Sequence, residues 1–313
     1  MKNKWKKAAA FAVSLAIVAG NSAGTFSNMT LVKASEANLQ VSETAESESV
    51  RKTTSDQGAD ESYFDAETQT LHLKGYVRNG GEGTGIILPD GIVGDDVKYL
   101  VADKGTVLPE DCSWLMYNLS AVETVDFKNA DSSNVTNMAY MFAPSTPFSY
   151  YFDEYDYDLC LPLRKIDLTG FDTSKVTDMR GLFKDLIHLQ EIDVSSFNTS
   201  NVTNMSSMFY YCNIESLDLS NFRTSSVTSM FQMFLQNTNL VDLNISSFNT
   251  KSVETMEQMF SECYNLRSLD LSNFDTSSVT SMFQMFFKNT NLVDLNISSF
   301  NTKSVETMQA NVF

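Results

Sequence analysis

The chain has 313 residues and a formal net charge of −17 at pH 7. A negative charge of this size argues against binding to nucleic acid or to anionic membrane surfaces, which select basic proteins. The hydrophobic content of 42% is ordinary, so the chain can bury a core.

Residues 1–34 have the features of a secretory signal peptide. Lysines at positions 2, 4, 6 and 7 precede an apolar stretch over residues 8–19, which is too short to span a bilayer. Val32-Lys33-Ala34 then offers a small-x-small cleavage motif. We therefore expect a secreted or cell-surface protein, from a Gram-positive bacterium as judged by the length of the peptide. Removing its five lysines takes the charge to −22 (−17 − 5), and no second apolar segment predicts an integral membrane span.

Two segments follow before any repeat begins. Residues 35–60 are rich in Ser, Glu and Thr and nearly lack large apolar residues, so they cannot bury enough surface to offset the entropy of ordering. We interpret them as a disordered linker. Residues 61–121 alternate short apolar runs with Gly-rich turns, which indicates a small β-rich cap module at the N-terminal end of the fold.

From residue 122 to residue 313 one unit recurs, with a period of about 26 residues. Each unit opens L-x-x-L-x-L-x-x-F, and we number its positions from the first apolar residue. The seven units begin at Val122, Leu163, Leu189, Ile214, Leu240, Leu266 and Leu292. Residues 217–256 and 269–308 differ at only three positions, which indicates that two units were duplicated together. An active site is built once, so near-identical copies favour architecture over catalysis.

The unit predicts one short strand and one short helical segment. The L-x-L alternation is typical of a strand with one buried face. The later V-x-x-M-x-x-M-F run has the three- and four-residue spacing of a helix. Neither element can bury its apolar face alone, but stacked coils can, because each position lies on its copy in the next coil. The sequence therefore predicts an α/β repeat solenoid of about seven coils. Its methionines, which recur at positions 17 and 20, are interpreted as core filler and not as a soft-metal site.

The repeat resembles that of the BspA-like leucine-rich-repeat surface proteins of bacteria, which is also known from mycoplasma lipoprotein-associated sequences. The match covers roughly residues 122–313. It is carried by Leu266, Leu269, Asp270, Leu271, Phe274, Thr276, Val279, Met282, Met285 and Phe286, with their copies. The resemblance implies a leucine-rich-repeat-like fold and a role in adhesion and protein–protein contact. The last unit departs from the pattern at Asn311 and Val312, so we expect an uncapped C-terminal coil.

One insertion interrupts the period, at residues 143–160. It contains several tyrosines among four acidic residues. Insertions in repeats map to loops, often on the binding face, and tyrosine gives a large contact area at low entropic cost. Two interpretations stay open, a contact surface for a protein partner and a variable loop without function. The candidate binding residues are Tyr150, Tyr151, Tyr155 and Tyr157.

Position five of the unit, which faces outward on the strand, is always an acid or an amide. The acidic candidates for binding are Asp167, Asp193, Asp218 and Asp270. This polar row could bind a basic partner or calcium. Alternatively, its side chains bond to neighbouring Ser and Thr in adjacent coils.

The remaining chemistry-bearing residues argue against catalysis. The chain has two histidines and no HExxH, GxSxG, Walker or CxxC motif, so we expect no enzyme activity and no cofactor. Cys160, Cys212 and Cys263 occupy nearly the same position in alternate coils, so neighbours among them lie about 10 Å apart, beyond the reach of a disulfide. We interpret these three as buried hydrophobic residues, while a Cys112–Cys160 pair stays open. Two functions follow: an adhesin-like module that binds host, matrix or cell-surface proteins, or a structural repeat protein that self-associates through its C-terminal coil.

Overall fold

The computed structural model describes residues 59–145 and 161–308, which belong to one compact unit, Ser55–Phe313. The predicted signal peptide and nearly all of the predicted linker lie outside the described residues. The fold begins at Asp60, which forms an isolated antiparallel bridge with Gly75.

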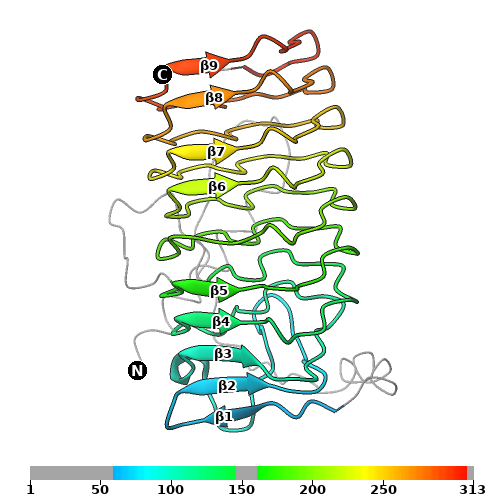
Figure 1. The fold of residues 1–313 in the computed structure, drawn as a ribbon, viewed down its shortest axis with the longest axis vertical. Coiled ribbons are helices and arrows are strands. Elements are labelled where there is room, and N and C mark those ends of the chain that lie inside the picture. The colour runs from blue at the N-terminus through cyan, green and yellow to red at the C-terminus, as the bar shows by residue number, and fades with distance from the viewer. Residues whose placement is uncertain (1–58, 146–160, 309–313) are drawn as a thin grey trace, which may run out of the picture. The chain divides into compact units, whose positions relative to one another are not determined.

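Short parallel strands, one above another, form one side of the coils (Figure 1). A five-stranded sheet has the order β1-β2-β3-β4-β5, in which only the β1–β2 pair is antiparallel. Two further parallel pairs, β6-β7 and β8-β9, continue the stack. The strands are β1 Tyr63–Asp65, β2 Thr70–Leu73, β3 Tyr99–Ala102, β4 Thr124–Asp126, β5 Lys165–Asp167, β6 Ser216–Asp218, β7 Asp242–Asn244, β8 Ser268–Asp270 and β9 Asp294–Asn296.

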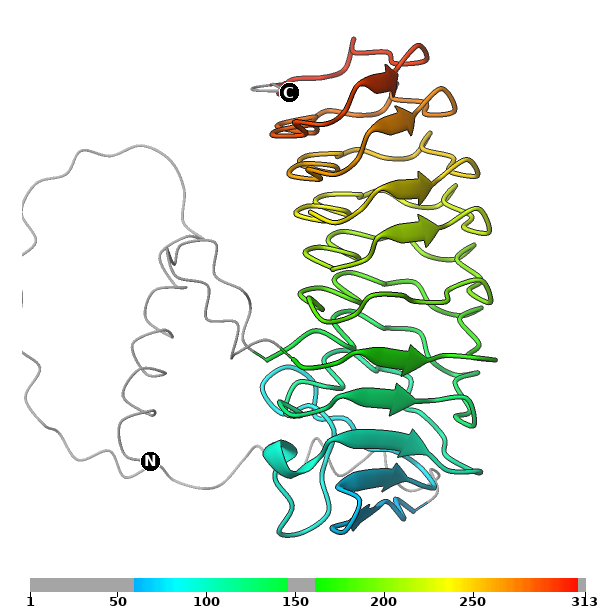
Figure 2. The same cartoon turned by 60° about the vertical axis from the view of Figure 1, so that its left-hand side comes forward.

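A second ladder of parallel bridges runs along the turn side of the coils. Its residues are Asp111, Asn137, Asp178, Asn204, Ser229, Thr255, Ser281 and Thr307. Each bridges its copy in the next coil, so the stack is continuous where no strand is assigned, as in the coil that begins at Leu189 (Figure 2). The solenoid has about eight turns. The additional turn comes from the C-terminal half of the predicted cap module, where β3 and Asp111 join the two ladders.

The α/β prediction is wrong, because the V-x-x-M-x-x-M-F segments are turns and not helices. In the described residues the single helical element is a 3-10 turn, η3 at Gly94–Asp96. In the coil that begins at Leu189, the N–H groups of Met205, Ser207 and Phe209 donate to carbonyls of the next coil at 3.1, 2.8 and 3.0 Å. These donors therefore cannot form the i→i−4 bonds of a helix. The Met208 N–H closes a turn onto the Met205 carbonyl at 3.2 Å.

Two left-handed residues in these segments also exclude a helix. Position 19 has a positive φ in Tyr140, Gly181, Ser207, Gln232, Gln258 and Gln284. Position 23 has one in Asp185, Tyr211, Gln236, Glu262 and Lys288. Positive φ at the third residue of a four-residue turn reverses the chain. This reversal brings positions 17, 20 and 21 to the core with the same spacing that a helix would give.

The predicted ladders of apolar side chains are confirmed. The leucine, valine, methionine and phenylalanine positions are buried in nearly every coil. Phenylalanines at position 21 stack from coil to coil, with ring centroids 5.5 Å apart for Phe183–Phe209 and 5.9 Å for Phe209–Phe234. Met205 and Met208 are fully buried, which agrees with their interpretation as core residues.

The insertion leaves the stacking of its neighbours unchanged. Leu163 follows Val122 by 41 residues, compared with 26 from Leu163 to Leu189. Even so, β4 pairs directly with β5, with Thr124 opposite Lys165. The two coils on either side of the inserted residues therefore remain in contact.

Cys112, Cys212 and Cys263 are buried and free, as expected for Cys212 and Cys263. Cys160 lies outside the described residues. The backbone N–H of Cys212 donates to the side-chain oxygen of Asn237 at 3.2 Å, and that of Cys263 donates to Asn289 at 2.9 Å. Cysteine and asparagine alternate at this core position from Cys212 to Asn289, and each asparagine side chain accepts the backbone N–H of the cysteine in the preceding coil.

Candidate functional site

The outward position of the strands forms a continuous column across the stack. Its members in the repeats are Asp126, Asp167, Asp193, Asp218, Asn244, Asp270 and Asn296. Where strands are assigned, these residues lie directly opposite their copies, as Asp126 opposite Asp167 and Asp218 opposite Asn244. Adjacent strands are about 4.8 Å apart. We name these residues the strand column.

Each member of the strand column is held by a local turn. The Oδ1 atom of Asp167 accepts the N–H of Thr169 at 3.0 Å, and that of Asp218 accepts the N–H of Ser220 at 2.9 Å. Asn244 makes the same contact with Ser246 at 3.2 Å. The sequence left open whether these side chains bond to Ser and Thr residues of adjacent coils. In the structure the serine and threonine that donate to them lie two residues further on in the same coil, and the donor is their backbone N–H.

These hydrogen bonds favour the charged form of the carboxylates. The pKa of Asp167, Asp218 and Asp270 is lowered mainly by the backbone N–H two residues on, and the hydroxyl of the same residue contributes next. For Asp193 the Ser195 hydroxyl is the larger cause of the lowered pKa, and the backbone N–H follows. Asp193, Asp218 and Asp270 are exposed, and Asp167 is half-buried. The column therefore presents ionised carboxylates to solvent at neutral pH.

The aromatic candidates cannot be placed beside this column. Tyr150, Tyr151, Tyr155 and Tyr157 lie outside the described residues. The structure brings together the acidic candidates alone.

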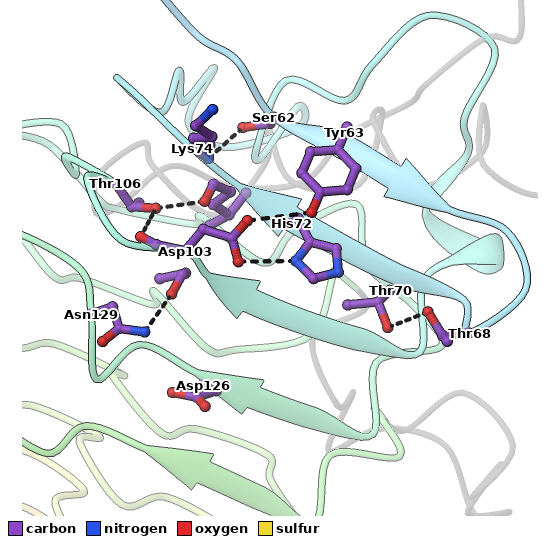
Figure 3. A network of polar contacts seen from close by, with 12 residues as sticks. Ser62, Tyr63, Thr68, Thr70, His72, Lys74, Asp103, Thr106, Asp126 and Asn129 are labelled. Atoms are coloured by element: carbon purple, nitrogen blue, oxygen red, sulfur yellow. Dashed lines mark hydrogen bonds and ion pairs between the residues drawn. The ribbon is translucent and has the colours of Figure 1, made fainter.

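At its N-terminal end the strand column continues into an aromatic and polar cluster that the sequence did not reveal. His72 of β2 lies opposite Val101 of β3, which in turn lies opposite Asp126. The His72 ring stacks on Tyr63 of β1, with centroids 4.7 Å apart, and its Nδ1 atom lies 3.0 Å from Asp103 Oδ1 (Figure 3). The Tyr63 hydroxyl donates to the other oxygen of Asp103 at 3.4 Å. His72 is thus a half-buried residue whose ring contacts the carboxylate of Asp103.

Residues 59–145 and 161–308 contain no group of three or more His, Cys, Asp or Glu side chains placed to hold a metal ion. Within the same ranges no helix is long and apolar enough to cross a membrane.

Comparison with known proteins places the repeat region in a family. Residues 110–213, 157–267 and 211–313 each match the family described as "Mycoplasma protein of unknown function, DUF285", so that 204 of 313 residues are covered. No curated protein matches the chain. Among solved structures the chain is similar to a leucine-rich-repeat protein of T. pallidum, with 14% identity and a TM-score of 0.24. That similarity covers 66% of this chain and 87% of the other.

Proposed function

The chain belongs to the DUF285 family of Mycoplasma proteins of unknown function, and from its repeat fold and charge we propose that it is a non-enzymatic, secreted or cell-surface module that binds a basic protein partner. The single observation that carries this proposal is the strand column. Ionised carboxylates occupy successive coils at Asp167, Asp193 and Asp218, and another follows at Asp270 beyond Asn244, on a periodic scaffold.

The charge of the strand column is not needed for the fold. Asn244 and Asn296 occupy the same position and accept the same backbone N–H, each at 3.2 Å. An Asp→Asn change therefore keeps the local turn and removes only the charge. Like charges about 5 Å apart also repel each other, and a partner with lysine and arginine side chains relieves that repulsion when it binds. Such a surface steers and selects basic partners.

The predicted signal peptide and the resemblance of the repeat to that of BspA-like surface proteins support a location at the cell surface. Adhesion to host or matrix proteins is the role that combines this location with the acidic column. We place the partner's basic segment along the column, across several coils.

An adhesion assay tests the proposal. Beads coated with the full chain are presented to purified matrix proteins that carry lysine-rich segments. We expect the triple variant Asp193→Asn/Asp218→Asn/Asp270→Asn to lose most of the adhesion. The matched control is Asp131→Asn/Asp172→Asn/Asp275→Asn, which removes three charges from position 10. At position 10 the Oδ1 atom of each aspartate likewise accepts the backbone N–H two residues on, at 2.8–3.0 Å. Equal adhesion of both variants would reject the strand column as the contact surface.

A second candidate function, self-association, is favoured by the last coil. Among the described residues β9 pairs only with β8, and Val293, Ile297 and Met308 are 87%, 43% and 48% exposed. Exposed strand edges with apolar neighbours template association. We expect oligomers that grow with concentration in sedimentation experiments, and Val293→Lys should suppress them. A monomer at every concentration would exclude this function.

A further inference from the structure

A pocket of about 440 Å³ lies where the first turn segments of the solenoid meet the Gly-rich turn of the cap module. It is separate from the strand column, because its walls come from the turn positions of the coils. Residues of three successive coils line it, among them Trp114, Tyr140 and Arg180, and Glu82 comes from the Gly-rich turn. This volume is within the range of small-molecule sites.

An aromatic pair forms one wall of the pocket. Trp114 and Tyr140 stack with ring centroids 4.3 Å apart and an interplanar angle of 12°. Both have a φ of 56°, at equivalent turn positions of neighbouring coils. Bulky residues rarely adopt this conformation. Later coils place Ser207 or Gln232 there, so the turn itself does not need aromatic residues.

The next coil makes room for this pair. Gly181 follows Tyr140 in the turn ladder, and a Cβ atom on it would lie 2.3 Å from two carbons of the Tyr140 ring. The Tyr140 ring is therefore held between Trp114 and the Gly181 backbone. Both aromatic residues nevertheless remain partly exposed and line the pocket.

The charges that line the pocket balance. Arg180 pairs with Asp178 at 3.0 Å, and Lys184 pairs with Asp185 at 2.5 Å. Among the lining residues, two acids (Glu82 and Asp185) oppose the two bases Arg180 and Lys184. A lining without net charge, whose bases are already paired, selects neither an anion nor a cation. It favours a neutral ligand with many hydrogen-bonding groups.

We propose that this pocket binds a neutral saccharide of one or two rings. The C–H face of a sugar packs on aromatic surface as other apolar surfaces do. Since both faces of the Tyr140 ring are covered, the exposed part of Trp114 supplies that surface and Tyr140 supplies its ring edge. Its hydroxyl groups pair with planar and hydroxyl side chains, which Asn137, Ser113 and Glu82 supply around the platform. The site requires no partner protein and is independent of the strand column.

Trp114 provides a direct readout, since Trp5 is the other tryptophan of the chain. In a Trp5→Phe background, Trp114 fluorescence is titrated with N,N′-diacetylchitobiose, cellobiose, lactose and maltose. We expect a saturable change with at least one of them. Gly181→Ala should weaken that binding by about tenfold, because the new methyl group displaces the Tyr140 ring while every polar group of the pocket remains. Ser207→Ala, at the same turn position one coil further on, should leave the affinity unchanged.

Thermal unfolding of both variants separates lost binding from lost folding. Tyr140→Ala, which leaves the Gly181 backbone untouched, should reduce the affinity as Gly181→Ala does. A failure of all four sugars to give a saturable change would overturn the saccharide assignment. It would equally be overturned if a tyrosine-containing peptide bound the pocket in their place, or if the folded Gly181→Ala and Tyr140→Ala variants bound sugar as tightly as the parent.

Discussion

Threonine at position 11 of the repeat shows how one side chain joins neighbouring coils. Thr224 is buried, and its hydroxyl donates to the Asn249 carbonyl at 2.9 Å while accepting the Asn249 N–H at 2.8 Å. The same pair of bonds joins Thr173 to Asn198 and Thr276 to Asn301. Each coil therefore needs a hydroxyl at this position, because a buried backbone group without a partner is costly.

Thr224→Val tests this contact with a side chain of the same shape. The change leaves the Asn249 N–H and carbonyl without their partner inside the core. We expect the free energy of unfolding to fall by about 1–3 kcal/mol, as measured by denaturant titration. Thr228→Val is the control, because the Thr228 hydroxyl donates to Thr203 at 3.3 Å on an exposed surface. Equal losses from both changes would show that the buried hydroxyl has no special role.

The buried thiols give a second prediction at this scale. Burial raises the pKa of Cys263 to about 12 and raises that of Cys212 as well. The thiolate is the reactive form, so we expect no alkylation of the folded Cys160→Ser variant at pH 8 and complete alkylation in denaturant. A thiol whose folded-state pKa is raised stabilises the fold fully below its unfolded pKa of about 8.5, and this contribution is lost as the pH rises toward the folded value. Stability should therefore decline from about pH 8.5 upward. Rapid alkylation of the folded protein would contradict the burial of these residues.

At the scale of the coil, the strand was predictable from sequence and the turn segment was not. Alternating leucines identified the strand, and the invariant Val, Met and Phe positions identified the core. The same three- and four-residue spacing also fits two tight turns, which left-handed residues at positions 19 and 23 create. Gly181 alone hinted at this conformation, because Gln232, Ser207 and Tyr140 are unusual at positive φ. The decisive bonds run between coils, where sequence periodicity gives no direct signal.

The cluster around His72 and the pocket beside Trp114 were not predicted from the sequence, for a related reason. Tyr63 meets His72 because β1 pairs antiparallel with β2, and Asp103 meets His72 because β2 pairs with β3. The pocket forms where the turn around Glu82 and the turn around Trp114 line the same cavity. Both clusters depend on residues of the cap module, outside the repeat, where no second copy helps to define the register.

Excision of whole coils tests the repeat as the unit of structure. Removing residues 240–291 joins equivalent positions of the repeat. The Cys212–Asn237 contact is kept, and the last coil then follows the coil that contains Asn237. Removing residues 240–265 instead brings Asn237 next to Asn289, so two amides meet where the parent alternates cysteine and asparagine. We expect cooperative thermal unfolding for both variants, and a lower melting temperature for the shorter excision although it removes less core. Loss of all cooperative structure in the 52-residue excision would contradict a solenoid of nearest-neighbour contacts.

For the whole molecule, charge and periodicity point in the same direction. The net charge of −17 is arranged partly as a regular column and not only as a diffuse surface. Because the pKa values of Asp193, Asp218 and Asp270 are lowered, these residues stay charged well below neutral pH. The fold thus provides an acidic surface whose length is set by the number of coils. Gene duplication can lengthen this surface, because each added coil repeats the same contacts with its neighbours.

The salt dependence of binding tests the central claim most directly. A fluorescent lysine-rich peptide is titrated with the full chain at pH 7 over a range of salt concentrations, and anisotropy reports the affinity. We predict that the parent and the Asp131→Asn/Asp172→Asn/Asp275→Asn control bind the peptide and lose affinity steeply as salt rises, because screening weakens exposed charge pairs. The Asp193→Asn/Asp218→Asn/Asp270→Asn variant should bind weakly, with little dependence on salt. If that variant instead bound the peptide with the parent's affinity and the parent's salt dependence, the strand column would not be the binding surface.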